Sequence, residues 1–184
     1  AIVPDDLKPA FKNLQLITSK PVIYVCNVEE SAADSGNSLS AKTQEKAAAE
    51  GAEAVIISAR IEEELAQLDD DERLEYLNSL GLEEPGLNRL IRQGYELLGL
   101  ITYFTAGPKE ARAWTIRKGM SAPQAAGVIH TDFERGFIKA ETIAFDDYTA
   151  HNGEAGAREA GRLRQEGKEY LVKDGDVLLF RFNV

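Results

Sequence analysis

The sequence has one cysteine, two histidines and no apolar segment of membrane-spanning length. The single cysteine, Cys26, cannot form a disulfide within the chain, and its place in the run Val-Ile-Tyr-Val-Cys predicts a small buried side chain. Structural zinc sites take four Cys or His ligands, so this class of site is excluded. Because no apolar run approaches the roughly 20 residues needed to cross a bilayer, we expect no membrane partner and a cytoplasmic location.

The phosphate-binding motif Gly-x-x-x-x-Gly-Lys-[Ser/Thr] is also absent. The backbone amides of this motif cradle phosphates, and its lysine and hydroxyl bind phosphate and magnesium. The nearest glycine-rich run, GEAGAREAG at 153–161, contains no lysine and does not lie between a strand and a helix. The chain therefore lacks the groups that stabilise charge during phosphoryl transfer. We expect no catalytic residue and no complete metal site in it.

The charge is unevenly distributed along the chain. The net charge of −10 argues against general affinity for nucleic acid. Between Val28 and Leu98 there are 17 acidic and 6 basic residues, whereas between Gly99 and Ile143 there are 4 acidic and 6 basic residues. The acidic run EEELAQLDDDERLEY is typical of a solvated helix face, with Asp69 to Asp71 capping the next helix, rather than of a metal or substrate site.

The first half of the chain has the pattern of an α/β unit. Apolar residues recur at helical spacing over 5–18, and the continuous apolar run at 22–26 is typical of a buried strand. A helix is predicted for 40–50 and a second strand for 54–57. A strand, a helix and a strand within about 35 residues predict a parallel βαβ unit, in which ligands bind at the carboxyl ends of the strands. Further helices are predicted at 61–68, 69–80 and 86–98.

The composition changes after Leu98, and we place a domain boundary near residues 98–101. Strand-like runs broken by glycine follow, with small-residue helices at 121–128 and 155–166. This pattern predicts an α+β module of about 85 residues, a size that folds independently. The predicted fold class is therefore α/β followed by α+β.

The two predicted strand ends carry residues that suit a purine base. Asn27, Val28 and Glu30 follow the first strand, and Ser58 and Ala59 follow the second. Loops at these positions read the base in P-loop nucleotide hydrolases, where a side-chain amide can donate and accept at a purine edge. The usual guanine reader is Asn-Lys-x-Asp, whose carboxylate accepts from two guanine N–H groups. Val28 and Glu30 in place of Lys and Asp therefore weaken a preference for guanine over adenine.

Structural interpretations compete with these functional ones. Asn-x-x-Glu alone is also typical of a capped strand end, and that alternative stays open. His130 has no nucleophile at a recognisable position and is expected in a capping turn, with Phe133 and Phe137 entering a core. Trp114 and Tyr103 are expected in a core or on a sheet face rather than as platforms for bases.

Longer stretches carry a family resemblance. LQLITSKPVIYVCNVEE, ISARIEEELAQL, the run from GLNRLIRQGYELL to GFIKAETI, and GKEYLVKDGDVLLFRFNV resemble the C-terminal half of the YchF family. These proteins are Obg-related, ribosome-associated ATPases, also called GTP-dependent nucleic-acid-binding protein EngD. The resemblance covers nearly the whole chain, and it is highly specific in the Thr105–Ile116 and Ile129–Ile138 stretches.

The resemblance implies two domains. Residues 1–98 would be the C-terminal part of a P-loop nucleotide-binding domain, with 1–18 ending its helical insertion. Residues 99–184 would be a TGS domain, a ubiquitin-like β-grasp module. The parent protein would be an ATPase or GTPase that binds ATP (or GTP) with Mg, of which this chain holds only a part. The first residue, Ala1 rather than Met, also favours a portion of a longer protein.

The resemblance also assigns residues to the nucleotide base. Asn27, Val28 and Glu30 match the family's Asn-x-x-Glu loop, and Ser58 and Ala59 match its second base loop. The family often has Met where Val28 stands, so the apolar contact with the base edge would be kept but shorter. The chain alone would be inactive, because the phosphate-binding loop is not in it.

The partner implied for the TGS domain is the ribosome or RNA. Its candidate phosphate contacts are the basic side chains of the second half: Lys109, Arg112, Arg117, Lys118, Arg135 and Lys139. A competing hypothesis is a non-catalytic module that binds RNA, the ribosome or a protein, in which residues 1–98 are only a scaffold. It predicts binding by residues 99–184 alone, falling steeply with salt.

Overall fold

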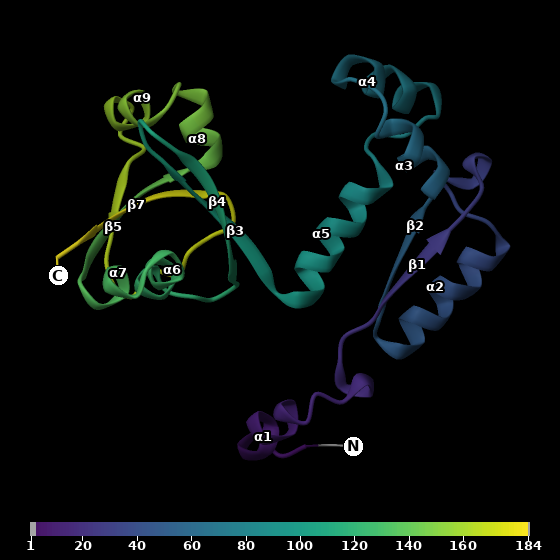
Figure 1. Cartoon of the computed structure of the whole chain (residues 1–184), viewed down its shortest axis with the longest axis horizontal. Helices are drawn as coiled ribbons and strands as arrows, with labels where there is room; N and C mark the ends of the chain where they lie inside the picture. The colour runs from purple at the N-terminus through teal and green to yellow at the C-terminus, as the bar shows by residue number, and fades with distance from the viewer. Residues whose placement is uncertain (1–2, 184) are drawn as a thin grey trace. The chain divides into compact units, whose positions relative to one another are not determined.

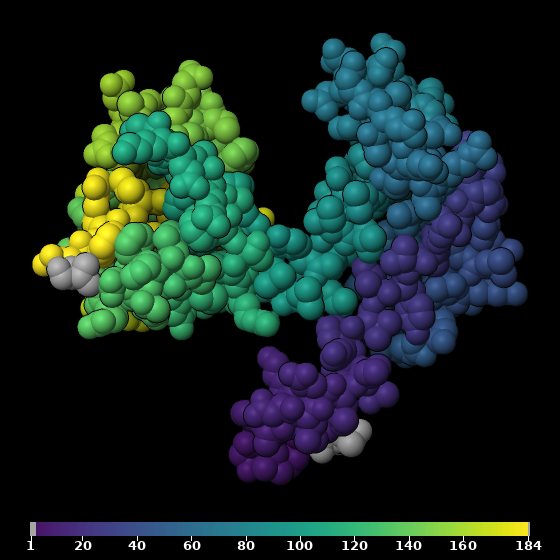
Figure 2. All heavy atoms as spheres, viewed as in Figure 1, coloured from purple at the N-terminus to yellow at the C-terminus, as the bar shows by residue number. Residues whose placement is uncertain are grey.

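The computed structural model describes residues 3–183 (Figure 1). Residues 1, 2 and 184, at the ends of the predicted ranges 1–18 and 99–184, lie outside the described residues. The chain divides into two compact units between Leu97 and Leu98. We call them the N-terminal unit and the C-terminal unit and describe each by itself. In the space-filling view, the green to yellow atoms of the C-terminal unit form one packed body (Figure 2).

The N-terminal unit contains the predicted parallel βαβ arrangement. Strand β1 (Ile23–Asn27) pairs in parallel with β2 (Glu53–Ile57), and α2 (Ser38–Glu50) connects them and packs on both. The Asn37 side chain begins α2 by accepting two backbone N–H bonds of the first turn, each at 3.0 Å. Gly51 ends it with φ of 67°, a conformation that favours glycine. The predicted strands and helix are confirmed here to within one or two residues.

Strand β1 is not the fully buried strand that its continuous apolar sequence predicts. Val22 and Val25 are each 47% exposed, and Cys26 is only partly buried. The physical reason lies in the size of the sheet, which has two strands among the described residues. With α2 packed against it, side chains that point away from α2 stay open to solvent in the described part of the chain.

The N-terminal segment forms less helix than its apolar spacing predicts. A 3-10 turn (Asp5–Leu7) leads into the short helix α1 (Lys8–Asn13), and a second 3-10 turn spans Ile17–Ser19. Gln15 has φ of 49°, so the right-handed helix cannot continue through it. The predicted helix over 5–18 is therefore wrong in its second half.

Three further helices follow β2 in the described part of the chain: α3 (Ala59–Leu65), α4 (Asp70–Ser79) and α5 (Gly86–Leu98). A one-turn 3-10 helix, Glu30–Ala32, precedes α2. Helices α3 and α4 pack around a small apolar core, whose buried members are Ala33, Ile61, Leu65, Leu77 and Leu82.

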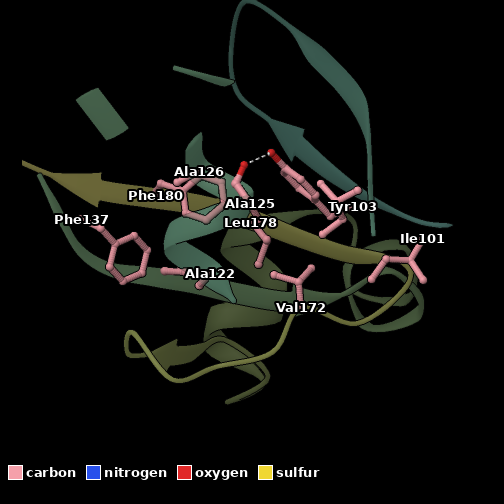
Figure 3. Close-up of a cluster of buried hydrophobic side chains, with 11 residues drawn as sticks. Ile101, Tyr103, Ala122, Ala125, Ala126, Phe137, Val172, Leu178 and Phe180 are labelled. Atoms are coloured by element: carbon pink, nitrogen blue, oxygen red, sulfur yellow. Dashed lines mark hydrogen bonds between the residues drawn. The ribbon is translucent and has the colours of Figure 1, made fainter. Parts of the chain in front are cut away.

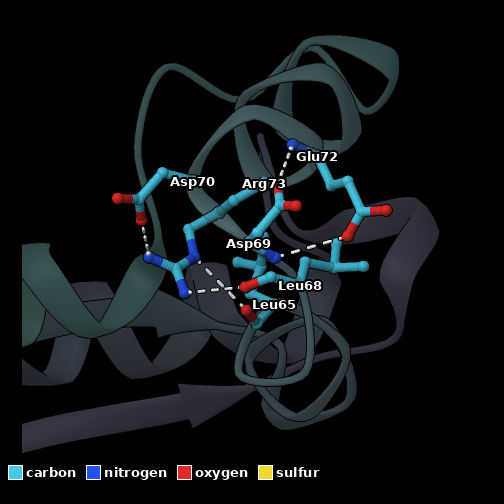
Figure 4. A network of polar contacts seen from close by, with 6 residues as sticks. All are labelled: Leu65, Leu68, Asp69, Asp70, Glu72 and Arg73. Atoms are coloured by element: carbon cyan, nitrogen blue, oxygen red, sulfur yellow. Dashed lines mark hydrogen bonds and ion pairs between the residues drawn. The ribbon is translucent and has the colours of Figure 1, made fainter.

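The acidic run between α3 and α4 has the capping role predicted for it (Figure 4). The Asp69 side chain accepts from the backbone N–H of Glu72 at 3.0 Å, and the Glu72 side chain accepts from the backbone N–H of Asp69. Arg73 donates to the carbonyls of Leu65 and Leu68 at 3.3 and 3.1 Å and pairs with Asp70 at 3.0 Å. Arg73 thus fixes the turn between the two helices.

The C-terminal unit is built on one mixed sheet of five strands, in the order β4-β3-β7-β5-β6. The neighbours β3 and β7 are parallel, and the other pairs are antiparallel. The parallel pair has β4, joined to β3 by a hairpin, on one side and antiparallel β5 and β6 on the other, an order that fits the predicted β-grasp arrangement. The strands are β3 (Leu100–Ala106), β4 (Ala111–Arg117), β5 (Phe137–Ala144), β6 (Arg164–Glu166) and β7 (Asp176–Phe182).

The core of the C-terminal unit lies between one face of the sheet and helix α6 (Ala122–Ile129) (Figure 3). Tyr103 is fully buried there, stacks near Trp114 at a centroid distance of 6.4 Å and donates its hydroxyl to the carbonyl of Ala125 at 2.9 Å. Alanines on α6 let the helix approach the sheet closely. The prediction that Tyr103 and Trp114 lie in a core or on a sheet face is confirmed: Tyr103 is buried, and Trp114 is partly buried against the core.

Three short helices surround this sheet: α7 (Thr131–Arg135), α8 (Phe145–Ala150) and α9 (Glu154–Glu159). His130 begins α7, its Nδ1 accepting from the backbone N–H of Asp132 at 3.1 Å, as predicted for a capping turn. The predicted helix over 155–166 is wrong beyond α9. Residues 164–166 form β6 instead, because they pair with β5 along its outer edge.

Candidate nucleotide-base site

The two predicted base loops meet at one edge of the β1–β2 sheet. Asn27 lies opposite Ile57 in the parallel register, so both strands end side by side. The Asn27 Oδ1 atom accepts from the backbone N–H of Ala59 at 2.9 Å, and the backbone N–H of Val28 donates to the carbonyl of Ile57 at 2.9 Å. Sequence spacing alone could not give this contact, which links residues 32 positions apart.

Ser58 brings a buried hydroxyl to this edge. The residue is 3% exposed, and its Oγ has no hydrogen-bond partner among residues 3–183. Its backbone carbonyl accepts from Glu62 N–H at 3.1 Å and so begins α3. A buried hydroxyl without a partner is costly and uncommon in proteins. The carboxyl edge of the sheet thus holds one buried polar atom without a partner among residues 3–183.

Glu30 is engaged by an arginine that the sequence patterns did not assign to the site. The Arg60 Nε atom lies 2.7 Å from Glu30 Oε1 and 3.6 Å from Glu64 Oε1. Tyr76 donates its hydroxyl to Glu64, and this bond, with partial burial, raises the pKa of Tyr76 to about 12. The signal for Arg60 was its position directly after Ser58-Ala59, four residues before Glu64. An arginine there can reach carboxylates from both elements.

Glu29 also takes part, on the side of α2. Its Oε2 accepts from Asn37 Nδ2 at 3.1 Å. The loop after β1 is thus held on one side through Asn37 and on the other through Arg60. Val28, between these attachments, is 9% exposed. Only a small part of the Val28 side chain is therefore open to the predicted apolar contact with a base edge.

The six basic candidates of the C-terminal unit do not form one patch. Lys109 lies in the turn between β3 and β4, and the Arg112 guanidinium lies over the Trp114 ring at 4.1 Å. Lys139, on β5, is three strands away from β4 in the sheet order and donates to Gln165 at 3.1 Å. The remaining three are exposed at the ends of β4 and α7: Arg117, Lys118 and Arg135.

Neither a metal site nor a membrane span occurs in the described part of the chain. No cluster of three or more Cys, His, Asp or Glu between residues 3 and 183 could hold a metal ion. None of the helices in the same range combines the length and the apolar character that a bilayer span requires.

Comparison with known proteins gives consistent matches. A family model described as "YchF-GTPase_C: Protein of unknown function (DUF933)" matches residues 100–183. The chain is 58% identical over 175 residues to "Ribosome-binding ATPase YchF" of Bacillus subtilis, which covers 94% of this chain and 48% of that protein. It is 56% identical over 177 residues to the Escherichia coli O157:H7 protein of the same name, covering 96% of this chain and 48% of that protein.

A solved structure matches over the same extent. The Schizosaccharomyces pombe YchF GTPase has a TM-score of 0.83 and 35% sequence identity, covering 98% of this chain and 48% of that chain. The chain thus spans about half the length of the curated relatives it matches.

Proposed function

The chain belongs to the YchF family and corresponds to its C-terminal portion, and from this premise we propose that it supplies two parts of a ribosome-associated nucleotide hydrolase. The N-terminal unit carries the purine-base recognition loops, and the C-terminal unit is a TGS domain that contacts the ribosome or RNA. The parent protein hydrolyses ATP or GTP with Mg and is cytoplasmic. The relatives named as ribosome-binding ATPases support this proposal.

The hydrogen bond from Ala59 N–H to Asn27 Oδ1 is the observation that carries the base assignment. It draws the two candidate loops together at the carboxyl edge of two parallel strands, where α/β folds bind ligands. Because Oδ1 is engaged, the amide nitrogen of Asn27 is the group left to donate to a ring acceptor of a purine. Ser58 Oγ, buried and without a partner in the described chain, supplies a further polar group.

Adenine is the base that this arrangement favours. A guanine reader needs a carboxylate free to accept from two N–H groups, whereas the Glu30 carboxylate is paired with Arg60 at 2.7 Å. Adenine presents an acceptor beside its amine and makes no such demand. We therefore propose ATP as the preferred nucleotide.

The phosphate groups and Mg are bound by another part of the intact protein. The chain has no Gly-x-x-x-x-Gly-Lys-[Ser/Thr] motif, and the half-exposed apolar side chains of β1 would be covered by further strands of the same domain. The residues of this chain would orient the base, while the bound magnesium would neutralise phosphate charge.

Titration of the intact protein with ATP tests the base assignment. Asn27→Asp keeps an acceptor for Ala59 N–H but removes the amide donor, so we expect ATP affinity to fall by about tenfold, the value of one hydrogen bond. Asn78→Ala, an exposed position on α4, is the matched control and should bind as the wild type does. Unchanged ATP affinity in Asn27→Asp would refute the assignment.

A further inference from the structure

The C-terminal unit has an apolar cleft that neither the base site nor the basic residues explain. It has a volume of about 300 Å³ and is lined by residues of α8 and of the hairpin end of β3 and β4. Its lining is mostly aromatic and small apolar side chains, chiefly Phe104, Ala106, Ala111, Ala113, Phe145 and Tyr148. The volume is at the lower limit of those that hold ligands and suits one large side chain.

The walls of the cleft are fixed by the fold. Phe145 begins α8 and donates its backbone N–H to the carbonyl of Gly175 at 3.0 Å, which holds this helix against the sheet. Its ring lies 5.4 Å from that of Phe104 on β3. On the other side, Ala113 is the register partner of Phe104 and has no side chain long enough to fill the space. The cleft is therefore preformed.

One wall of the cleft is an edge strand. Among residues 3–183, β4 is the last strand at its side of the sheet. The backbone N–H of Gly107 donates to the carbonyl of Glu110, and the backbone N–H of Lys118 donates to the carbonyl of Gly99. These two bonds show which residue pairs along β3 and β4 are hydrogen-bonded to each other and which are not. In an antiparallel pair, the residues between hydrogen-bonded positions point their backbone groups outward. Ala111 and Ala113 therefore offer N–H and C=O groups to a further strand, beside the cleft that their side chains line.

The charge along the β4 wall of the cleft is mainly positive, whereas α8 on the facing wall carries Asp146 and Asp147. Between Gly107 and Lys118 there are four basic residues and a single acidic one, Glu110. The ligand that complements this edge carries negative charge on both sides of an apolar residue. A single-stranded nucleic acid is also negative and can stack bases on aromatic side chains, but the outward N–H and C=O groups of Ala111 and Ala113 match a peptide backbone and not a sugar–phosphate chain. The polar groups here are already used: Thr105 Oγ1 accepts from Trp114 Nε1, and Arg112 lies over the Trp114 ring.

We propose that the β4 edge is a docking site for an extended acidic peptide. The peptide adds a sixth strand beside β4, exchanges backbone hydrogen bonds with Ala111 and Ala113, and inserts one aromatic or aliphatic side chain into the cleft. Strand addition of this kind takes its affinity from backbone bonds and its specificity from pockets for alternate side chains. This site is independent of the proposed base site, since it lies wholly within the C-terminal unit.

Amide chemical shifts of the 184-residue chain, titrated with defined peptides, test the proposal. The probe is Glu-Asp-Val-X-Val-Asp-Glu, with X as Phe, Trp, Leu or Val. We expect the amides of Ala111, Ala113 and Phe145 to shift, most strongly for one of the four anchors. Replacing X by Asn, or the acidic flanks by Lys-Arg, should weaken binding by about tenfold or more. An absence of shifts at Ala111 and Ala113 with all four peptides overturns the proposal.

Two variants separate docking from a fold defect. Ala113→Pro removes an outward N–H without removing a bond of the β3–β4 ladder, so the sheet should keep its shifts while peptide binding falls two- to tenfold, roughly the value of one hydrogen bond. Ala113→Ser keeps the N–H and is the matched control. Equal peptide affinity for both variants contradicts strand addition. A decauridine RNA that shifts the same amides and displaces the peptide would assign the cleft to nucleic acid instead.

Discussion

The two units differ in how completely their sheets are covered. In the N-terminal unit a two-stranded sheet leaves Val25 47% exposed in the middle of β1. In the C-terminal unit the central strand β7 lies between β3 and β5, and its Leu178 is 1% exposed. Both residues are apolar. Leu178 of the C-terminal sheet is thus buried within its own unit, whereas Val25 of β1 stays half-exposed among the described residues.

The polar contacts follow the same division. At the candidate base site the ion pair of Glu30 with Arg60 is on the surface, and exposed pairs of this kind contribute little to stability. In the C-terminal unit Asp176 is buried, accepts from Tyr170 Oη at 2.7 Å and from Lys173 N–H at 2.9 Å, and joins the turn to β7. The exposed contacts are free to rearrange around a ligand, while the buried ones hold a scaffold.

The largest effect should come from removing a core side chain. Leu178→Ala is expected to lower the free energy of unfolding of the C-terminal unit by about 2–5 kcal/mol, because it leaves a cavity in a closed core. The only tryptophan, Trp114, reports this unit in urea unfolding. Val25→Ala should cost less than about 1 kcal/mol in this chain but more in the intact protein. An equal loss of unfolding free energy for Val25→Ala in this chain and in the intact protein would contradict the proposed difference in how the two sheets are covered.

A somewhat smaller loss should follow from removing a buried carboxylate. Asp176→Ala leaves Tyr170 Oη and Lys173 N–H without their acceptor, and we expect a loss of about 2–3 kcal/mol by urea unfolding. Glu30→Ala, which removes an exposed partner of Arg60, is the control from the other unit and should change stability by less than about 1 kcal/mol. A costly Glu30→Ala would show that its ion pair is structural.

The pH dependence of unfolding should differ between the two units, because different contacts raise the pKa values of their tyrosines. Burial, then a hydrogen bond to Asp176, raises the pKa of Tyr170 to about 12, and burial also raises the pKa of Tyr103. A raised folded pKa stabilises the protonated phenol below pH 10, and this contribution is lost as the pH rises through 10 to 12. Trp114 fluorescence should show this loss, and Tyr170→Phe should reduce its slope.

The effect of salt on this pH dependence should also differ between the two units. In the N-terminal unit, the pKa of Tyr76 is raised chiefly by its hydrogen bond to Glu64 near the surface. Amide hydrogen exchange of α4 should therefore depend on pH in a salt-sensitive way, whereas the C-terminal unit should respond similarly at low and high salt. The same salt dependence in both units would contradict burial as the main cause in the C-terminal unit.

The smallest effect concerns the selection of the base. Arg60→Ala frees the Glu30 carboxylate, so the affinity of the intact protein for GTP should rise relative to ATP by a few-fold, within the value of an exposed ion pair. Lys42→Ala, an exposed cation on α2, is the matched control and should leave the GTP to ATP ratio unchanged. A ratio that stays constant in Arg60→Ala would remove Arg60 from the site.

Periodicity predicted elements well where local signals were strong. The α2 helix carries its own start at Asn37 and stop at Gly51, and both are used. It failed where tertiary pairing decides the outcome: residues 164–166 have helical neighbours but form β6, because β5 offers a free edge. The sequence pattern also gave a wrong prediction for the burial of β1. An apolar sequence shows that a strand can be buried, but it does not show which other elements pack against the strand.

The sequence predicts the residue types of the candidate site but not the hydrogen bonds and ion pairs between them. The residues at the two strand ends follow from the βαβ pattern, whereas the contact of Asn27 with Ala59 requires the parallel register. Arg60 follows the second strand end but was not assigned to the site, because a single arginine in an acidic helix is common on solvated faces. Its role depends on Glu30 from another element, which only the fold brings within 2.7 Å.

The most direct test of the account is calorimetric titration of ATP with Mg into the intact protein and into this 184-residue chain under the same conditions. We expect the intact protein to bind ATP and the chain alone to show no measurable binding, because its base loops lack the phosphate-binding partner. ATP binding to the chain alone with the affinity of the intact protein would contradict the claim that the chain holds half of a nucleotide site.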